Sequence, residues 1–111
     1  MAWSIEYPYS DVEEFILELP PKLAAKYLWI TDFMLEFGAN LGMPHTRAMS
    51  SGLFELRIKG QEGIGRVFYC TLVGQRIAML HGYIKKSQKT PSKELRIAKR
   101  RMAEVIASEA S

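Results

Sequence analysis

Apolar residues recur at helical spacing in the first third of the chain. Ser10 and Glu13 have the spacing of a capping box, so we expect a helix that begins at Ser10. Pro20-Pro21 ends this helix, and Pro21 suits the first turn of a second helix that ends at Gly38. The first apolar stripe is Val12, Phe15, Ile16 and Leu19, and the second is Leu23, Tyr27, Ile30, Met34 and Phe37. Two amphipathic helices joined this tightly predict a helical hairpin over a sheet.

In the middle of the chain the apolar period changes to two. Residues 53–58 place Phe54, Leu56 and Ile58 on one face of a strand, with Glu55 and Arg57 on the other. Residues 64–73 are apolar on both faces, which is typical of a central strand covered on both sides. A two-residue loop at 74–75 then predicts an antiparallel return over 76–84. A further short strand near residues 2–6 is compatible with the pattern.

The last part of the chain reads as one helix. Thr90 fits the N-cap and Pro91 fits the first helical position. The apolar stripe of this helix is Leu95, Ala98, Met102, Val105 and Ile106, and most other positions are basic. We therefore predict an α+β fold: an N-terminal helical hairpin packed on a small antiparallel sheet with a C-terminal helix, forming one domain over residues 1–111.

Composition adds an uneven charge distribution to this picture. The net charge is +3, but residues 1–44 sum to −5 and residues 45–111 sum to +8. The basic half favours a polyanion or an acidic protein as partner, while an ordinary solvated surface is the alternative. The single cysteine, Cys70, excludes an internal disulfide, and a reducing cytoplasm is the simplest compartment. The chain shows neither a signal-peptide pattern at its start nor an apolar run of ~20 residues.

Few familiar catalytic motifs occur. The sequence has no phosphate-binding loop leading into a helix, no cluster of metal ligands and no nucleophile elbow. His45 and His81 together would suit acid–base cleavage of RNA. A capping or exposed role for His45, and a hydrogen-bonded, partly buried role for His81, are the simpler interpretations.

The basic residues near the predicted strand ends carry more information. Antiparallel pairing of the first two long strands brings Arg57 close to Arg66, and two neighbouring guanidiniums repel unless an anion lies between them. The basic loop over residues 85–89 can close over the same region. Such a cluster can hold a phosphate and stabilise the added charge of its transition state. Neutralisation by Glu55 and Glu62 is the alternative.

Three parts of the sequence occur in a recognisable order: GLFELRIKGQEGIGRVFY at 52–69, LHGYIKKSQKTP at 80–91 and the basic helix that follows. Taken together, they resemble the RelE/HigB toxin superfamily, in particular its phage-derived, HigB-like branch. The resemblance covers roughly residues 10–107. It implies the fold of RelE and ParE toxins and a ribosome-dependent messenger-RNA endonuclease. In that reaction a ribose 2′-hydroxyl attacks the adjacent phosphate, without a metal or another cofactor.

The same resemblance implies roles for individual residues. The expected catalytic residues are Arg57, Arg66 and Lys86. The expected RNA-binding residues are Lys59, His81, Tyr83, Lys85 and Lys89. Many family members carry an acid–base residue in a C-terminal strand or tail. This chain instead ends in a helix, so the resemblance identifies no general base.

The resemblance also implies partners. These are an antitoxin with a helix-turn-helix domain, the ribosome and messenger RNA, with no membrane, in a monomer or a toxin–antitoxin hetero-oligomer. Two alternatives keep the fold but change the activity: a ParE-like poison of DNA gyrase, and a non-enzymatic phage-derived binding or regulatory protein. Four aromatic residues fit either an antitoxin groove or core packing: Tyr7, Tyr9, Trp29 and Phe33.

Overall fold

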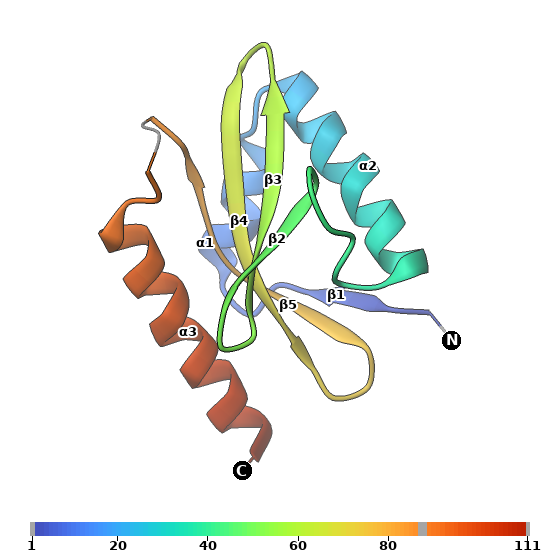
Figure 1. Cartoon of the computed structure of the whole chain (residues 1–111), viewed down its shortest axis with the longest axis vertical. Helices are drawn as coiled ribbons and strands as arrows, with labels where there is room; N and C mark the ends of the chain where they lie inside the picture. Colours follow the sequence, from blue (N-terminus) through green and yellow to red (C-terminus); the bar gives the residue numbers. More distant parts are fainter. Residues whose placement is uncertain (1, 87–88, 111) are drawn as a thin grey trace.

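The structure is a computed structural model that describes residues 2–86 and 89–110. Helices and strands alternate in blocks along this part of the chain (Figure 1). Their order is β1 (Ser4–Glu6), α1 (Ser10–Leu17), α2 (Pro21–Phe37), β2 (Thr46–Ser50), β3 (Leu53–Gly60), β4 (Gly63–Leu72), β5 (Arg76–Ile84) and α3 (Ser92–Ala110). None of the helices in the described ranges is long and apolar enough to cross a membrane.

The strands form one sheet in the order β1-β5-β4-β3-β2. The pairs from β2 to β5 are antiparallel, whereas β1 pairs in parallel with β5. The α+β class is therefore confirmed, but the predicted antiparallel sheet is wrong at this edge, and the sheet is mixed. Arg76 helps to hold β1 there, because its guanidinium donates two hydrogen bonds to the Glu6 carboxylate, at 2.7 and 3.0 Å.

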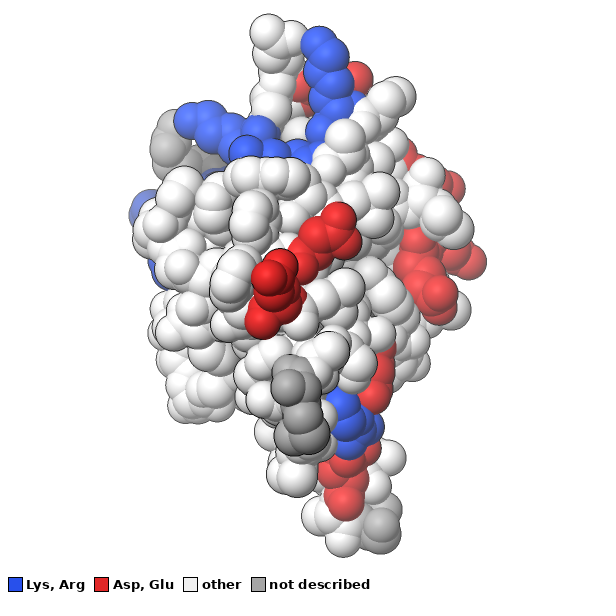
Figure 2. Space-filling view, turned by 90° about the vertical axis from the view of Figure 1, so that its right-hand side faces the viewer, with Lys and Arg blue, Asp and Glu red and all other residues white. Residues whose placement is uncertain are grey.

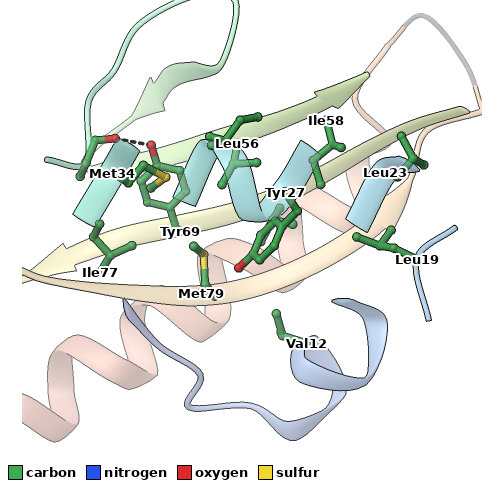
Figure 3. Close-up of a cluster of buried hydrophobic side chains, with 13 residues drawn as sticks. Val12, Leu19, Leu23, Tyr27, Met34, Leu56, Ile58, Tyr69, Ile77 and Met79 are labelled. Atoms are coloured by element: carbon green, nitrogen blue, oxygen red, sulfur yellow. Dashed lines mark hydrogen bonds between the residues drawn. The ribbon is translucent and has the colours of Figure 1, made fainter. Parts of the chain in front are cut away.

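Two apolar layers cover the two faces of the sheet. Helices α1 and α2 bury Val12 and Tyr27 with Leu56 and Tyr69 in one layer (Figure 3). Helix α3 covers the opposite face, and the layer beneath it is Leu53, Phe68, Cys70, Ala78, Leu80, Tyr83, Ala98 and Val105. Successive strand residues point to opposite faces, so β4 contributes to both layers, as its doubly apolar sequence predicts.

The strand boundaries confirm most of the period-two pattern. The return strand over 76–84 is confirmed, β3 extends two residues beyond the predicted 53–58, and β4 begins and ends one residue earlier than predicted. The predicted length of the β4–β5 loop is wrong by one residue. Leu72 pairs with Arg76, so the loop holds three residues, and both Gly74 and Gln75 adopt positive φ. Strand β2 has no counterpart in the prediction, since its short sequence TRAMS shows no apolar alternation.

Helix boundaries depart from the sequence pattern at several points. The N-cap of α1 is Tyr9, without a side-chain cap, so the predicted Ser10 capping box is wrong. Helix α3 begins at Ser92, where the Leu95 amide donates to the Pro91 carbonyl, rather than at Pro91. Phe37 is 66% exposed instead of buried, because α2 ends there and Gly38 turns the chain away at φ 103°.

Candidate functional site

Three side chains form a row across β3, β4 and β5, near one end of these strands. Arg57 of β3 lies opposite Arg66 of β4, which in turn lies opposite Tyr83 of β5. Residues in direct register share a face, so all three belong to the face that α3 covers further along. The predicted approach of Arg57 to Arg66 is therefore confirmed by the register.

Arg66 is a buried cation. Its side chain is 4% exposed, and its Nε lies 3.6 Å from the Oε1 of Glu55, which is equally buried. One guanidinium nitrogen donates to the Gly65 carbonyl at 3.0 Å, but within the described residues Nε has no hydrogen-bond partner. Burial lowers the pKa of the Arg66 guanidinium, the attraction of Glu55 opposes that shift, and repulsion from Arg57 adds to it.

Arg57 lines a pocket beside β3. Its amide donates to the His45 carbonyl at 2.8 Å, and its Nη1 lies 3.2 Å from the Sδ of Met43. This contact docks the loop after α2 against β3. The resulting pocket has a volume of about 360 Å³ and is lined by Lys26, Met43, Pro44, His45, Arg57, Lys59 and Arg66.

The positive charge at this end of the sheet exceeds the negative charge. The pKa of Lys85 is lowered by burial and then by repulsion from Arg66 and Arg57, which outweighs the attraction of Glu55. The Oε1 of Glu55 also forms an ion pair with Arg47, whose Nε lies 3.8 Å away. Glu55 therefore takes part in the neutralisation that the sequence left open. Glu62 does not, since its carboxylate accepts the Lys22 amide at 2.8 Å.

His81 and Tyr83 lie beside this cluster on β5. The Nε2 of His81 forms a 2.7 Å hydrogen bond with the Oε1 of Glu94 on α3, which confirms the expected bonded, partly buried histidine. The ring of Tyr83 is stacked against the rings of Phe68, at 5.9 Å between centroids, and His81, at 6.4 Å. Burial raises the pKa of the Tyr83 phenol, which therefore stays protonated at neutral pH.

The remaining predicted residues are distributed unevenly. Lys59 lines the pocket with Arg57 and Arg66, whereas Lys86 and Lys89 are exposed and do not line it. Closure of the 85–89 loop over the site involves residues 87 and 88, which lie outside the described residues. The structure thus brings three of the predicted residues into one pocket and places Tyr83 and Lys85 close to them.

Sequence reasoning missed one whole wall of the pocket. Lys26 comes from α2, and Met43, Pro44 and His45 come from the loop that follows it. His45 is the one signal that the sequence offers, but the sequence favours a capping or exposed role for it because it predicts no strand β2. Without β2, nothing in the sequence placed this loop beside β3.

The site has the chemistry of an anion-binding pocket. Neighbouring guanidiniums offer forked N–H donors that match phosphate oxygens. Across the described ranges, His, Cys, Asp and Glu side chains form no group of three or more that could hold a metal ion. Figure 2 shows the side of the molecule where α2 lies, with Lys and Arg gathered at its upper end and Asp and Glu over its middle and right.

These features define a small α+β protein with a cationic pocket at one edge of its sheet. A family model described as phage-derived protein Gp49-like (DUF891) matches residues 14–103, and the chain belongs to this family. The family is associated with toxins of the RelE/HigB type. The comparison with curated proteins gives no match.

Proposed function

We propose that this protein is the toxin of a toxin–antitoxin pair and cleaves messenger RNA on the ribosome. The observation that carries the proposal is the pairing of Arg57 with Arg66 in register at one pocket. Membership of a family associated with RelE/HigB-type toxins supports the same direction. An antitoxin that binds the toxin is the partner that this proposal requires.

In the proposed reaction the oxygen of a ribose 2′-hydroxyl bonds to the adjacent phosphorus, and the bond from phosphorus to the 5′-oxygen breaks. The 2′-hydroxyl loses its proton and the leaving 5′-oxygen gains one. The products are a 2′,3′-cyclic phosphate and a free 5′-hydroxyl. The phosphate oxygens carry more negative charge in the transition state, so Arg57 and Arg66 bind that state more strongly than the substrate.

Proton transfer is assigned to groups beside the two arginines. Lys85 suits protonation of the leaving oxygen, because burial and then the neighbouring cations lower its pKa and make its ammonium a stronger acid. Glu55, in ion-pair range of Arg66, His81, held by Glu94, and His45 in the pocket lining are the candidate proton acceptors. This assignment needs no metal ion.

The proposal is tested by mapping the 5′ ends of transcripts after brief induction. A translatable reporter is compared with a copy that lacks its start codon. New 5′-hydroxyl ends on the translated copy alone are expected, and ends on both copies would exclude the ribosome requirement. Growth arrest without new ends would favour the gyrase poison, and neither effect would favour a binding protein.

The same assay compares variants of the site. Arg57→Ala and Arg66→Lys are expected to reduce the new ends by at least about 100-fold, the usual effect of removing a transition-state donor. Arg100→Ala is the matched control, since Arg100 is exposed on α3 and lies 3.9 Å from Glu104. Full cleavage by the Arg57 and Arg66 variants would contradict the proposed site.

A further inference from the structure

The cationic pocket has a second wall of different chemistry. Arg57, Lys59 and Arg66 form its basic side, whereas Met43, Pro44 and His45 supply thioether, pyrrolidine and imidazole surfaces. At about 360 Å³ the pocket falls in the size range of cavities that hold small organic ligands. A phosphate on the guanidiniums would leave the space beside the second wall unfilled.

The second wall is held in place by the surrounding structure. The amides of His45 and Thr46 donate to the Gly42 carbonyl at 3.1 and 3.0 Å, and the Gly42 amide donates to the Thr46 hydroxyl at 2.8 Å. The ring of Trp29 packs edge-on against the His45 ring at 5.2 Å. The wall is therefore fixed before any ligand binds, which reduces the entropy cost of binding.

We infer that Met43, Pro44 and His45 form a nucleobase subsite for a nucleotide whose phosphate lies on Arg57 and Arg66. This inference rests on the proposed function and extends it, because it names what the pocket binds besides the phosphate. Every base has an apolar π face that stacks on aromatic rings and packs on Met or Pro side chains. Lys26 adds a cation at the same wall, 4.9 Å from the centre of the Trp29 ring.

Negative charge on α2 confines the proposed nucleobase subsite to the pocket. Beyond Trp29, two more exposed aromatic rings follow along α2. The ring centre of Phe33 lies 4.9 Å from that of Trp29, and the ring centre of Phe37 lies 6.0 Å from that of Phe33. Asp32 and Glu36 line a hollow together with Trp29 and Phe33, and their carboxylates repel an RNA backbone. The base is therefore held at His45 and not along the helix.

The inference is tested by titrating the full chain with three probes: adenosine 5′-monophosphate, ribose 5-phosphate and inorganic phosphate. Isothermal calorimetry is expected to show that the mononucleotide binds about tenfold more tightly than ribose 5-phosphate, as stacking of one base predicts. His45→Ala and Met43→Ala are expected to remove that advantage. Phe37→Ala, an exposed aromatic residue of α2 outside the pocket, keeps it.

The outcomes separate this inference from the proposed function. Equal affinity of the wild-type protein for the mononucleotide and for ribose 5-phosphate would overturn the subsite, even if RNA were cleaved. A tenfold advantage that survives both wall variants would also overturn it, since the base would then lie elsewhere. Conversely, the advantage supports the subsite even in a protein that cleaves no transcript.

Discussion

Glu55 and Arg66 bring opposite charges into a buried part of the sheet. Their side chains are 3% and 4% exposed, and they are 3.6 Å apart without a direct hydrogen bond at the Arg66 Nε. A buried charge that loses its partner is costly, because it has neither water nor a counter-ion. Glu55 therefore makes it possible for Arg66 to remain a cation at the pocket.

Glu55→Gln tests this dependence with little change in shape. We expect the free energy of unfolding to fall by about 3 kcal/mol, since the substitution leaves a buried guanidinium uncompensated. Urea unfolding measures the change, with the exposed Glu36→Gln on α2 as the control for loss of one carboxylate. Wild-type stability in Glu55→Gln would show that Arg66 finds its compensation elsewhere.

Lys85 gives the proposed reaction a predictable pH dependence. Its ammonium is the form that donates a proton, so the cleavage rate falls as pH rises through its pKa. Because burial and neighbouring cations lower that pKa, we expect the decline to begin below the usual range of a lysine. Cleavage rates from pH 6 upward measure it.

Lys85→Arg is the diagnostic variant for this profile. An arginine stays protonated across the range, so the decline at high pH should disappear while the overall rate falls. Lys93→Arg makes the same change at an exposed position of α3 and should leave the profile as it is. A decline that persists in Lys85→Arg would assign the titrating group elsewhere.

At the scale of elements, α1 can pack closely against β5 because Gly82 has no side chain. A Cβ placed on Gly82 would lie 2.5 Å from a ring carbon of Phe15, closer than side chains pack. We expect Gly82→Ala to destabilise the fold by about 1–3 kcal/mol, the usual cost of overfilling a packed site. Gly65→Ala is the control, because its Cβ would meet Ile58 at an ordinary 3.5 Å. Equal unfolding midpoints for the two variants would contradict this contact.

Tyr9 joins α1 to the last helix. Its hydroxyl donates to the Glu104 carboxylate at 2.7 Å, and the Arg101 guanidinium lies 4.3 Å from its ring centre. Burial, followed by the hydrogen bond to Glu104, raises the pKa of Tyr9 to about 12. Its contribution to stability is therefore complete below the unfolded pKa of about 10 and is lost as pH rises toward 12.

Tyr9→Phe should flatten the alkaline part of the stability profile. Denaturant unfolding between pH 8 and pH 11.5 is expected to show a steeper loss for the wild-type protein than for Tyr9→Phe. Other buried tyrosines titrate in both proteins, so the difference between the two curves isolates Tyr9. Parallel stability curves for the two proteins would mean that the pKa of Tyr9 is the same in the folded and the unfolded state. That result would contradict the hydrogen bond to Glu104.

The elements that the sequence predicted are those whose apolar pattern is long enough to have a period. Residues 53–58 and 76–84 alternate clearly, and the i, i+3, i+4 stripe of α2 marks its buried face. The short strand that the pattern allowed near residues 2–6 is confirmed as β1, but its parallel pairing with β5 has no local signal. Strand β2 has five residues, too few for a pattern, and its place depends on long-range pairing. The same limit hid the second wall of the pocket, since the loop before β2 is located only by that pairing.

For the whole molecule, the basic half of the sequence overstates the positive charge that would be available to the proposed RNA substrate. Arg101 donates to the Asp11 carboxylate and to the Leu80 carbonyl, which ties α3 to α1 and the sheet. Arg76 bridges Glu6 and Glu109. These pairs use acids of both halves, so under the proposed function we expect the cations at the pocket, rather than Arg76 and Arg101, to contact RNA.

Salt dependence measures how many cations contact the RNA backbone. For a short single-stranded RNA, we expect Arg57→Ala and Lys59→Ala each to reduce the slope of log affinity against log salt by about 0.7, the value for one phosphate contact. Arg100→Ala removes the same charge from α3 and should leave the slope unchanged. Fluorescence anisotropy of labelled RNA gives the slopes, and equal slopes in all three variants would place the RNA elsewhere.

The two indole rings of the chain lie in very different surroundings. Trp3 packs over Gly38, where an added Cβ would come within 3.3 Å of its ring, whereas Trp29 is 47% exposed and contacts His45 at the pocket. Trp3→Phe would leave Trp29 as the one strong intrinsic fluorophore. Its emission would then change when the neighbouring wall is occupied, which gives the protein a built-in optical reporter that requires no attached dye.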